Sequence, residues 1–200
     1  MSRAPSYRDA CRPQPREVAG IGLVVFTVGH ALALRHLGSP LLPDDSDRDP
    51  EVGLGDLALA LAVCERQFAT SNDRALSKRT VTIANQLTRR HRKHSAEWWE
   101  AMLVAEFRDY LAESMAGPVF TVKAEYQSGR SGGADWLQGL ILDLMSAGYT
   151  HGEVLEMPFG KARWDWSAYW EKQGRIEIES DEDREFMAWA DKVAAEAEQQ

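Results

Sequence analysis

An uncharged run of seventeen residues, VAGIGLVVFTVGHALAL at 18–34, constrains the fold of this chain more than any other stretch of its sequence. Such a run has to leave water, either in a bilayer or in a protein core. Seventeen residues is about the shortest helix that spans a bilayer, and Gly29 and His30 interrupt the apolar side chains. We therefore expect a buried core helix over about residues 18–37, ended by Gly38-Ser39-Pro40, and no membrane span.

The stretch before this run is rich in arginine, as the start of a secretory signal peptide would be. It also carries Asp9, Glu17 and prolines, which do not suit such a leader. We therefore reject a signal peptide and expect residues 1–16 to form a flexible arm rich in arginine and proline.

Periodicity and capping residues predict further helices. Asp56 suits the N-cap of a short apolar helix at 57–68. The segment 72–94 has a helical period that directs Leu76, either Val81 or Ile83, and Leu87 towards the core.

The segment 95–117 begins with a Ser-Ala-Glu capping pattern and ends before a proline, which predicts a long helix. Its core-facing residues recur at helical spacing: Trp99, Met102, Leu103, Phe107, Tyr110 and Leu111. Because Trp98 is adjacent to Trp99, one of the two indoles has to point elsewhere. We expect three more helices, at about 135–147, within the aromatic segment 157–174 and at 181–200.

Two stretches alternate apolar and polar side chains, as strands do. They lie at about 119–126 (VFTVKAEY) and 175–180 (RIEIES). The sequence therefore predicts a mainly α fold. A single helical core domain at 17–180, with about six to seven helices and a small two-stranded β ribbon, precedes an acidic C-terminal helix at 181–200.

A formal net charge of −8 argues against general affinity for nucleic acid. The dense basic run is RRHRKH at 89–94, in which Arg89, Arg90, Arg92 and Lys93 could contact phosphates. Alternatively, these cations suit the negative end of a helix dipole. They could also pair with residues 175–200, which hold nine acidic and three basic side chains, within one chain or between copies.

No catalytic or metal-binding signature stands out. His91, His94 and Glu97 could share a helix face, but their spacing is not a known zinc motif. Cys11 and Cys64 lie in unrelated contexts without a CxxC pattern. We therefore expect a protein that is not an enzyme and binds no metal or cofactor.

The segment MPFGKARWDWSAYWEKQG at 157–174 is dense in aromatic residues. On a helix, Phe159, Trp166 and Trp170 fall within about 20° of one another and form a core stripe. Trp164 lies about 140° away on the more polar side. It is either an anchor for a partner or a residue that the tertiary fold covers.

Two stretches resemble small helical proteins encoded among the tail genes of tailed bacteriophages. One is GLVVFTVGHALALRHLGSPLL followed by GDLALALAVC, and the other is WLQGLILDLMSAGYTHGEVLEMPFGKARWDWSAYWEKQG. The resemblance implies a non-enzymatic tail-assembly protein of the chaperone type, which covers a long helical tape-measure protein in the host cytoplasm. A structural component of the virion, in the tail or at the head–tail junction, is the alternative, and a nucleic-acid-associated regulator that uses residues 89–94 is a further one.

A chaperone of this type needs an apolar groove for a client helix. Four residues are our predictions for that groove: Trp164, Trp98, Trp136 and Leu137.

Overall fold

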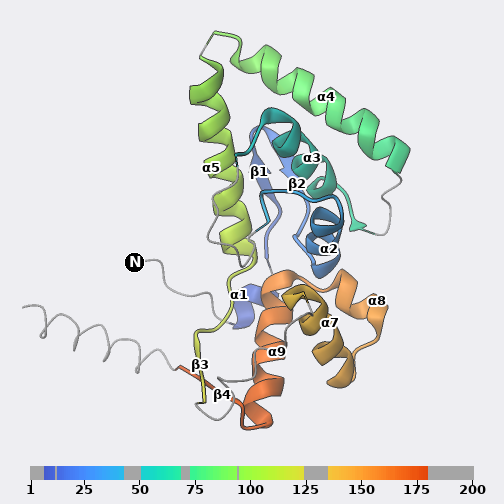
Figure 1. Ribbon diagram of the computed structural model, residues 1–200, viewed down its shortest axis with the longest axis vertical. Helices are drawn as coiled ribbons and strands as arrows, with labels where there is room; N and C mark the ends of the chain where they lie inside the picture. Colours follow the sequence, from blue (N-terminus) through green and yellow to red (C-terminus); the bar gives the residue numbers. More distant parts are fainter. Residues whose placement is uncertain are drawn as a thin grey trace, which may run out of the picture.

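In the computed structural model, residues 7–11, 13–42, 51–68, 73–93, 95–123 and 135–179 are described (Figure 1). This part of the chain is mainly helical with two small antiparallel sheets, which confirms the predicted fold class. The helices are α1 (Tyr7–Cys11), α2 (Val28–His36), α3 (Leu54–Cys64), α4 (Asp73–His91), α5 (Ala96–Ser114), α7 (Trp136–Ser146), α8 (His151–Glu156) and α9 (Phe159–Lys172). The strands are β1 (Arg16–Val18), β2 (Ile21–Leu23), β3 (Phe120–Val122) and β4 (Ile176–Ile178).

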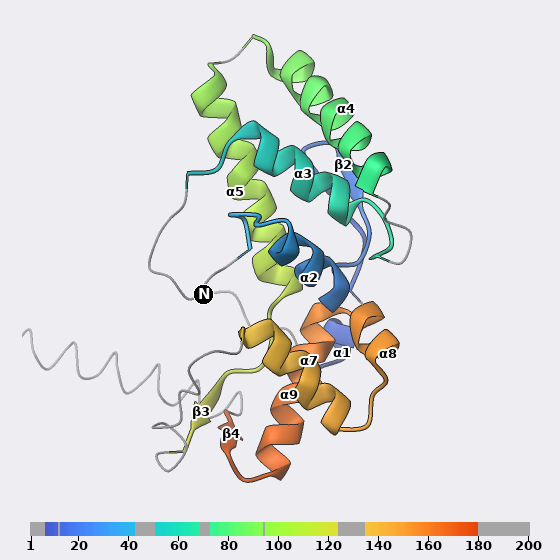
Figure 2. The same ribbon diagram turned by 45° about the vertical axis from the view of Figure 1, so that its right-hand side comes forward.

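The molecule is elongated, and its two ends differ in architecture. The connection between α4 and α5 lies at one end of the long axis, and the β3–β4 ribbon lies at the other (Figures 1 and 2). Helix α5 runs from the first end towards the second, and α7, α8 and α9 pack together near the ribbon.

The expectation of one buried helix over residues 18–37 is wrong. The first part of the run forms the hairpin of β1 and β2, with Val18 opposite Ile21, and helix α2 starts only at Val28. The turn residues Ala19 and Gly20 have φ angles of 54° and 74°. Two consecutive positive φ angles match the twist of a tight hairpin and cannot occur inside a right-handed helix. Burial of the run is nevertheless as expected, since Val18, Ile21 and Val28 are buried.

Helix α2 begins with a capping box in which histidine takes the place of the usual glutamate or glutamine. The hydroxyl of Thr27 accepts from the His30 backbone N–H at 3.4 Å, and the Thr27 backbone N–H donates to His30 Nδ1 at 3.1 Å.

Helix α3 begins at Leu54, three residues earlier than expected, because Asp56 accepts from the Gly53 N–H at 3.0 Å. Asp56 therefore stands inside the first turn and is not the N-cap.

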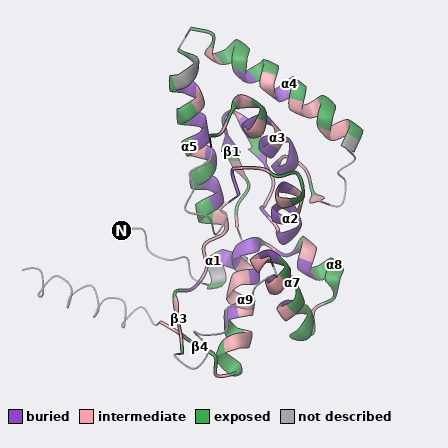
Figure 3. Ribbon diagram, viewed as in Figure 1, coloured by how far each residue is buried: buried purple, intermediate pink, exposed green. Residues whose placement is uncertain are grey.

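The predicted core faces of α4 and α5 are largely confirmed (Figure 3). In α4, Ile83 and Leu87 are buried, whereas Val81 is 60% exposed, which resolves the choice between Val81 and Ile83. In α5, all of the predicted core residues are buried except Met102, which is 40% exposed.

The predicted ribbon is confirmed as the antiparallel pair of β3 and β4, with Phe120 opposite Ile178 and Val122 opposite Ile176. Residues 124–126 of the predicted first strand lie outside the described residues, as does the predicted helix at 181–200.

Part of the predicted flexible arm is structured. Residues Tyr7–Cys11 form α1, which packs against α9 and buries Ala10. The arm therefore contributes to the fold, and β1 already begins at Arg16, one residue before the predicted start of the core domain.

Candidate functional site

One face of α9 is joined to α7 by its tryptophans. The indole N–H groups of Trp166 and Trp170 both donate to Oδ2 of Asp143, each at 2.8 Å. At the start of α9, Phe159 is fully buried, and its ring lies 5.9 Å from the rings of Phe26 and Trp136. The predicted core stripe of α9 therefore exists, but two of its tryptophans are partly exposed and pack through a shared carboxylate.

The other face of α9 is covered by α1. The Tyr7 ring meets the Trp164 ring edge to face at 6.1 Å, and a Cβ added at Gly160 would lie 3.4 Å from Cβ of Ala10. Trp164 Nε1 is buried and has no hydrogen-bond partner among the described residues. Trp164 is half-buried, with α1 over part of it, which favours coverage by the tertiary fold over an exposed anchor.

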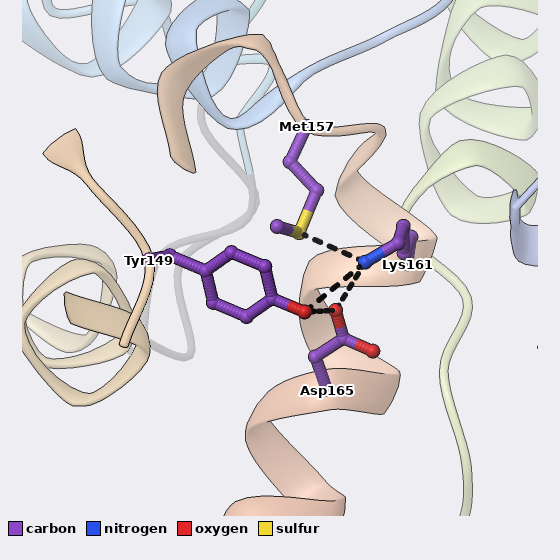
Figure 4. Close-up of polar contacts among 4 residues, drawn as sticks. All are labelled: Tyr149, Met157, Lys161 and Asp165. Atoms are coloured by element: carbon purple, nitrogen blue, oxygen red, sulfur yellow. Dashed lines mark hydrogen bonds and ion pairs between the residues drawn. The ribbon is translucent and has the colours of Figure 1, made fainter. Parts of the chain in front are cut away.

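A polar cluster joins the α7–α8 connection to α9 (Figure 4). The hydroxyl of Tyr149 donates to Oδ2 of Asp165 at 2.8 Å, and the Lys161 ammonium donates to the same oxygen. The ammonium also lies 5.2 Å from the centre of the Tyr149 ring and 3.9 Å from Met157 Sδ.

Titration of this cluster follows from its contacts. Hydrogen bonding to Asp165 raises the pKa of Tyr149, and burial adds to that effect. Burial works against the charged form of Lys161, but the hydrogen bond and the charge of Asp165 outweigh it, so the Lys161 pKa is raised. Lysine and tyrosine are thus held in their protonated forms, and neither is prepared to act as a base. The cluster therefore suits a structural role, in which it holds the α7–α8 connection against α9.

A cavity of about 560 Å³ opens between the segment that follows α1, the start of α2 and the α8–α9 connection. Its wall is mainly apolar, with Pro13, Val24, Phe68 and Pro158 among the residues that line it. The polar side chains in the wall are those of Cys11, Thr27, His30, Gln67 and Glu156. The volume lies in the range of small-ligand pockets.

His30 holds the inner wall of this cavity in place. It is only 1% exposed, its Nε2 lies 2.6 Å from the Arg66 carbonyl oxygen, and its ring stacks on Phe26 at 5.9 Å. Because a carbonyl only accepts, Nε2 carries the proton and Nδ1 accepts from Thr27. Burial lowers the pKa of His30, although the bond to Arg66 opposes that shift. Both ring nitrogens are used to hold the fold.

The end of the molecule where α4 meets α5 carries a different kind of surface. Trp99 is 4% exposed and stacks on His91 at 5.2 Å, whereas Trp98 is 57% exposed. Met102, one turn along α5 on the same side as Trp98, is exposed as well. The prediction that adjacent Trp98 and Trp99 point in different directions is confirmed.

Exposed basic side chains lie at the same end of the molecule, at the end of α4 and in the connection that follows it. Arg89, Arg92 and Lys93 are exposed, and they make no ion pair with any residue that the structure describes. Arg90 differs from them, because its Nη1 donates to the Ala19 carbonyl at 3.0 Å and so holds the β1–β2 turn. We name these exposed residues at the end of α4, in the connection that follows it and at the start of α5 (Arg89, Arg92, Lys93, Trp98 and Met102) the α4–α5 corner.

The structure does not bring the four predicted groove residues together. Leu137 is fully buried, so its prediction as a docking residue is wrong: it packs in the core below α7. Trp136 is partly buried against the core, with its ring on Phe159. Trp164 is covered by α1, and only Trp98 is widely exposed. Sequence spacing placed these residues on helices, but it did not show which helix faces meet.

Other possible sites offer little chemistry. Within the described residues, no group of histidine, cysteine and acidic side chains could hold a metal ion. His94 and the Glu97 side chain, two members of the weak metal hypothesis, lie outside that part.

Cys64 is fully buried, and burial raises the pKa of its thiol, which disfavours the reactive thiolate. None of the described helices has the length and apolar character needed to cross a bilayer.

Comparison with protein-family models, with curated proteins and with solved structures gives no match to this chain.

Proposed function

We propose that this chain is a non-enzymatic assembly factor for the tail of a bacteriophage, and that it acts in the host cytoplasm by binding a tape-measure-type tail protein. The two family-like stretches of sequence support this proposal. The observation that carries it is the 57% exposure of Trp98 on a long, well-packed helix. An indole held in this way is a typical anchor of protein–protein contacts.

The α4–α5 corner suits one kind of partner. Trp98 and Met102 lie one helical turn apart, which matches the i, i+4 spacing at which an amphipathic helix presents its apolar residues. The neighbouring Arg89, Arg92 and Lys93 favour acidic side chains at the edge of that helix. The client segment is therefore an amphipathic, acidic helix, as a long helical tail protein can supply.

The decisive experiment is co-expression with the long tape-measure-like protein of the same genome, followed by capture at low and high salt. We expect a complex that survives high salt and is lost with Trp98→Ala. Leu142→Ala is the matched control, since Leu142 is 60% exposed on α7, away from the corner. Capture that is equal for wild type and Trp98→Ala would count against the corner, and no capture at either salt would favour a structural virion component.

The exposed cations at the corner favour a second candidate function. Arg89, Arg92 and Lys93 could contact phosphates, which would make this chain a nucleic-acid-associated regulator. That function requires DNA affinity that falls steeply with salt and disappears when the three cations are replaced by alanine. The net charge of −8 works against it.

A further inference from the structure

The α4–α5 corner has charge and apolar features that a segment of this same chain complements. Its three exposed cations have no acidic partner in the described part of the chain, and Trp98 and Met102 are exposed at the start of the next helix, α5. A partner for this surface needs acidic side chains and at least two apolar side chains at helical spacing.

Residues 181–200 meet both requirements in their sequence. They contain seven acidic and two basic side chains, and the acidic ones are concentrated at 181–185. Phe186, Trp189 and Val193 follow at i, i+3 and i+7, the spacing of one apolar helix face. Acidic residues at the start of such a helix also suit its dipole.

The point at which this segment leaves the described part of the chain is far from the corner. It follows β4, which lies at the opposite end of the long axis (Figures 1 and 2). Helix α5, with 19 residues, lies between the two ends and is about 28 Å long. The separation favours a contact between the segment of one molecule and the corner of another.

We propose that the acidic segment 181–200 of one copy binds the α4–α5 corner of a second copy. The contact joins different surfaces of the two molecules, so the association is head to tail. This inference depends on the proposed function in one respect, namely that the tape-measure-type client binds the same corner. The neighbouring copy and the client then compete, and self-association protects the apolar corner until the client is available.

Sedimentation equilibrium of the purified full chain, without any client, tests this contact. We expect an average mass that rises with protein concentration and falls with added salt. Trp98→Ala is expected to weaken the association at least about tenfold, because truncating an interface anchor commonly costs more than about 1.4 kcal/mol. A monomer at every concentration overturns the proposal.

Charge reversal identifies the two surfaces. One variant carries Arg89→Glu, Arg92→Glu and Lys93→Glu, and another carries Asp181→Lys, Glu182→Lys and Asp183→Lys. Each is expected to be monomeric alone, and their mixture should associate again because each supplies the charge that the other lacks. Lys123→Glu with Lys172→Glu is the control, since both lysines are exposed elsewhere and should leave association intact.

Circular dichroism of every variant checks that a lost association does not reflect unfolding. A mixture that stays monomeric, with both variants folded, overturns the head-to-tail contact. Because no client is present, these outcomes are independent of the proposed function. Failure of the monomeric, acid-reversed variant to capture the tail protein would count against the proposed function alone.

Discussion

The α9 helix and the α4–α5 corner both carry tryptophans, but they use them in opposite ways. In α9, Trp166 and Trp170 donate to one carboxylate of α7, and Trp164 lies under α1. At the corner, Trp99 is buried and its neighbour Trp98 is 57% exposed. The densest aromatic segment of the chain is thus used for internal packing, and an isolated pair provides the accessible indole.

The difference teaches that the density of aromatic residues is a poor guide to docking. Each α9 tryptophan packs against another element because α9 lies between α7 on one side and α1 on the other. Helix α5 is packed on one side near its start, so adjacent residues there divide between core and surface. Four substitutions or conditions test this comparison.

Phe159→Ala should have the largest effect, because it removes a fully buried ring between Phe26 and Trp136. We expect a loss of about 3–5 kcal/mol in the free energy of unfolding, measured by urea denaturation. Phe159→Leu, which keeps most of the volume, should cost about 1.5 kcal/mol or less. A small loss for the alanine variant would mean that the start of α9 is not part of the core.

Asp143→Ala should have the next largest effect, because it leaves the indole N–H groups of Trp166 and Trp170 without their acceptor. We expect a loss of about 1–3 kcal/mol in the free energy of unfolding, together with a change in tryptophan fluorescence. Asp143→Asn keeps an acceptor oxygen and should recover part of the loss. Equal stability of wild type and the alanine variant would contradict the role of this carboxylate in joining α7 to α9.

Acidification should destabilise the contact between α2 and the segment that follows α3 through His30. Its pKa is about 6.5 in the unfolded chain and lower in the folded protein, so the unfolded state binds the proton first as the pH falls. This contribution is complete above about pH 6.5 and decreases below it by up to about 1.4 kcal/mol per pH unit, until the folded pKa is reached.

Urea denaturation between about pH 7.5 and pH 5 measures this loss. His30→Gln is the control, because its amide can accept from the Thr27 N–H and does not titrate. It also leaves Cys11 and Glu156, which line the same cavity, unchanged. The same slope in wild type and His30→Gln would show that other groups cause the pH dependence.

Trp98→Ala should have the smallest effect on folding, because the indole is mostly in water before the change. We expect a change within about 0.5 kcal/mol in the free energy of unfolding. Trp99→Ala, one residue along, should cost about 3–5 kcal/mol, since that ring is buried on His91. Similar costs for the two substitutions would remove the contrast on which the corner rests.

Much of the secondary structure follows from local pattern. The period of 3.6 and the caps predicted α4, α5, α7 and α9, and alternation predicted the β3–β4 ribbon. The prediction of one helix from the apolar run at 18–34 was wrong, because an uncharged stretch is equally compatible with a helix and with a buried hairpin. The turn at Ala19 gives no sequence signal as strong as Asn-Gly, so only the positive φ angles show where the run divides.

The partner surface was predictable only in part. Adjacent helical residues are 100° apart, so Trp98 and Trp99 had to separate whatever the tertiary fold was. No comparable argument was available for Leu137, the second residue of α7, because the residues next to it do not show which face of the helix packs against the core.

The sequence by itself determined helices α4, α5, α7 and α9, the ribbon and the divergence of Trp98 from Trp99, because each depends on residues a few positions apart. Only the tertiary structure decided that Trp164 is covered, that Leu137 is buried and that the basic corner stays accessible. Those outcomes depend on contacts such as Tyr7 with Trp164 and Asp143 with Trp166, between residues far apart in the chain. Helical periodicity fixes the direction of a side chain, whereas its burial depends on which other element packs there.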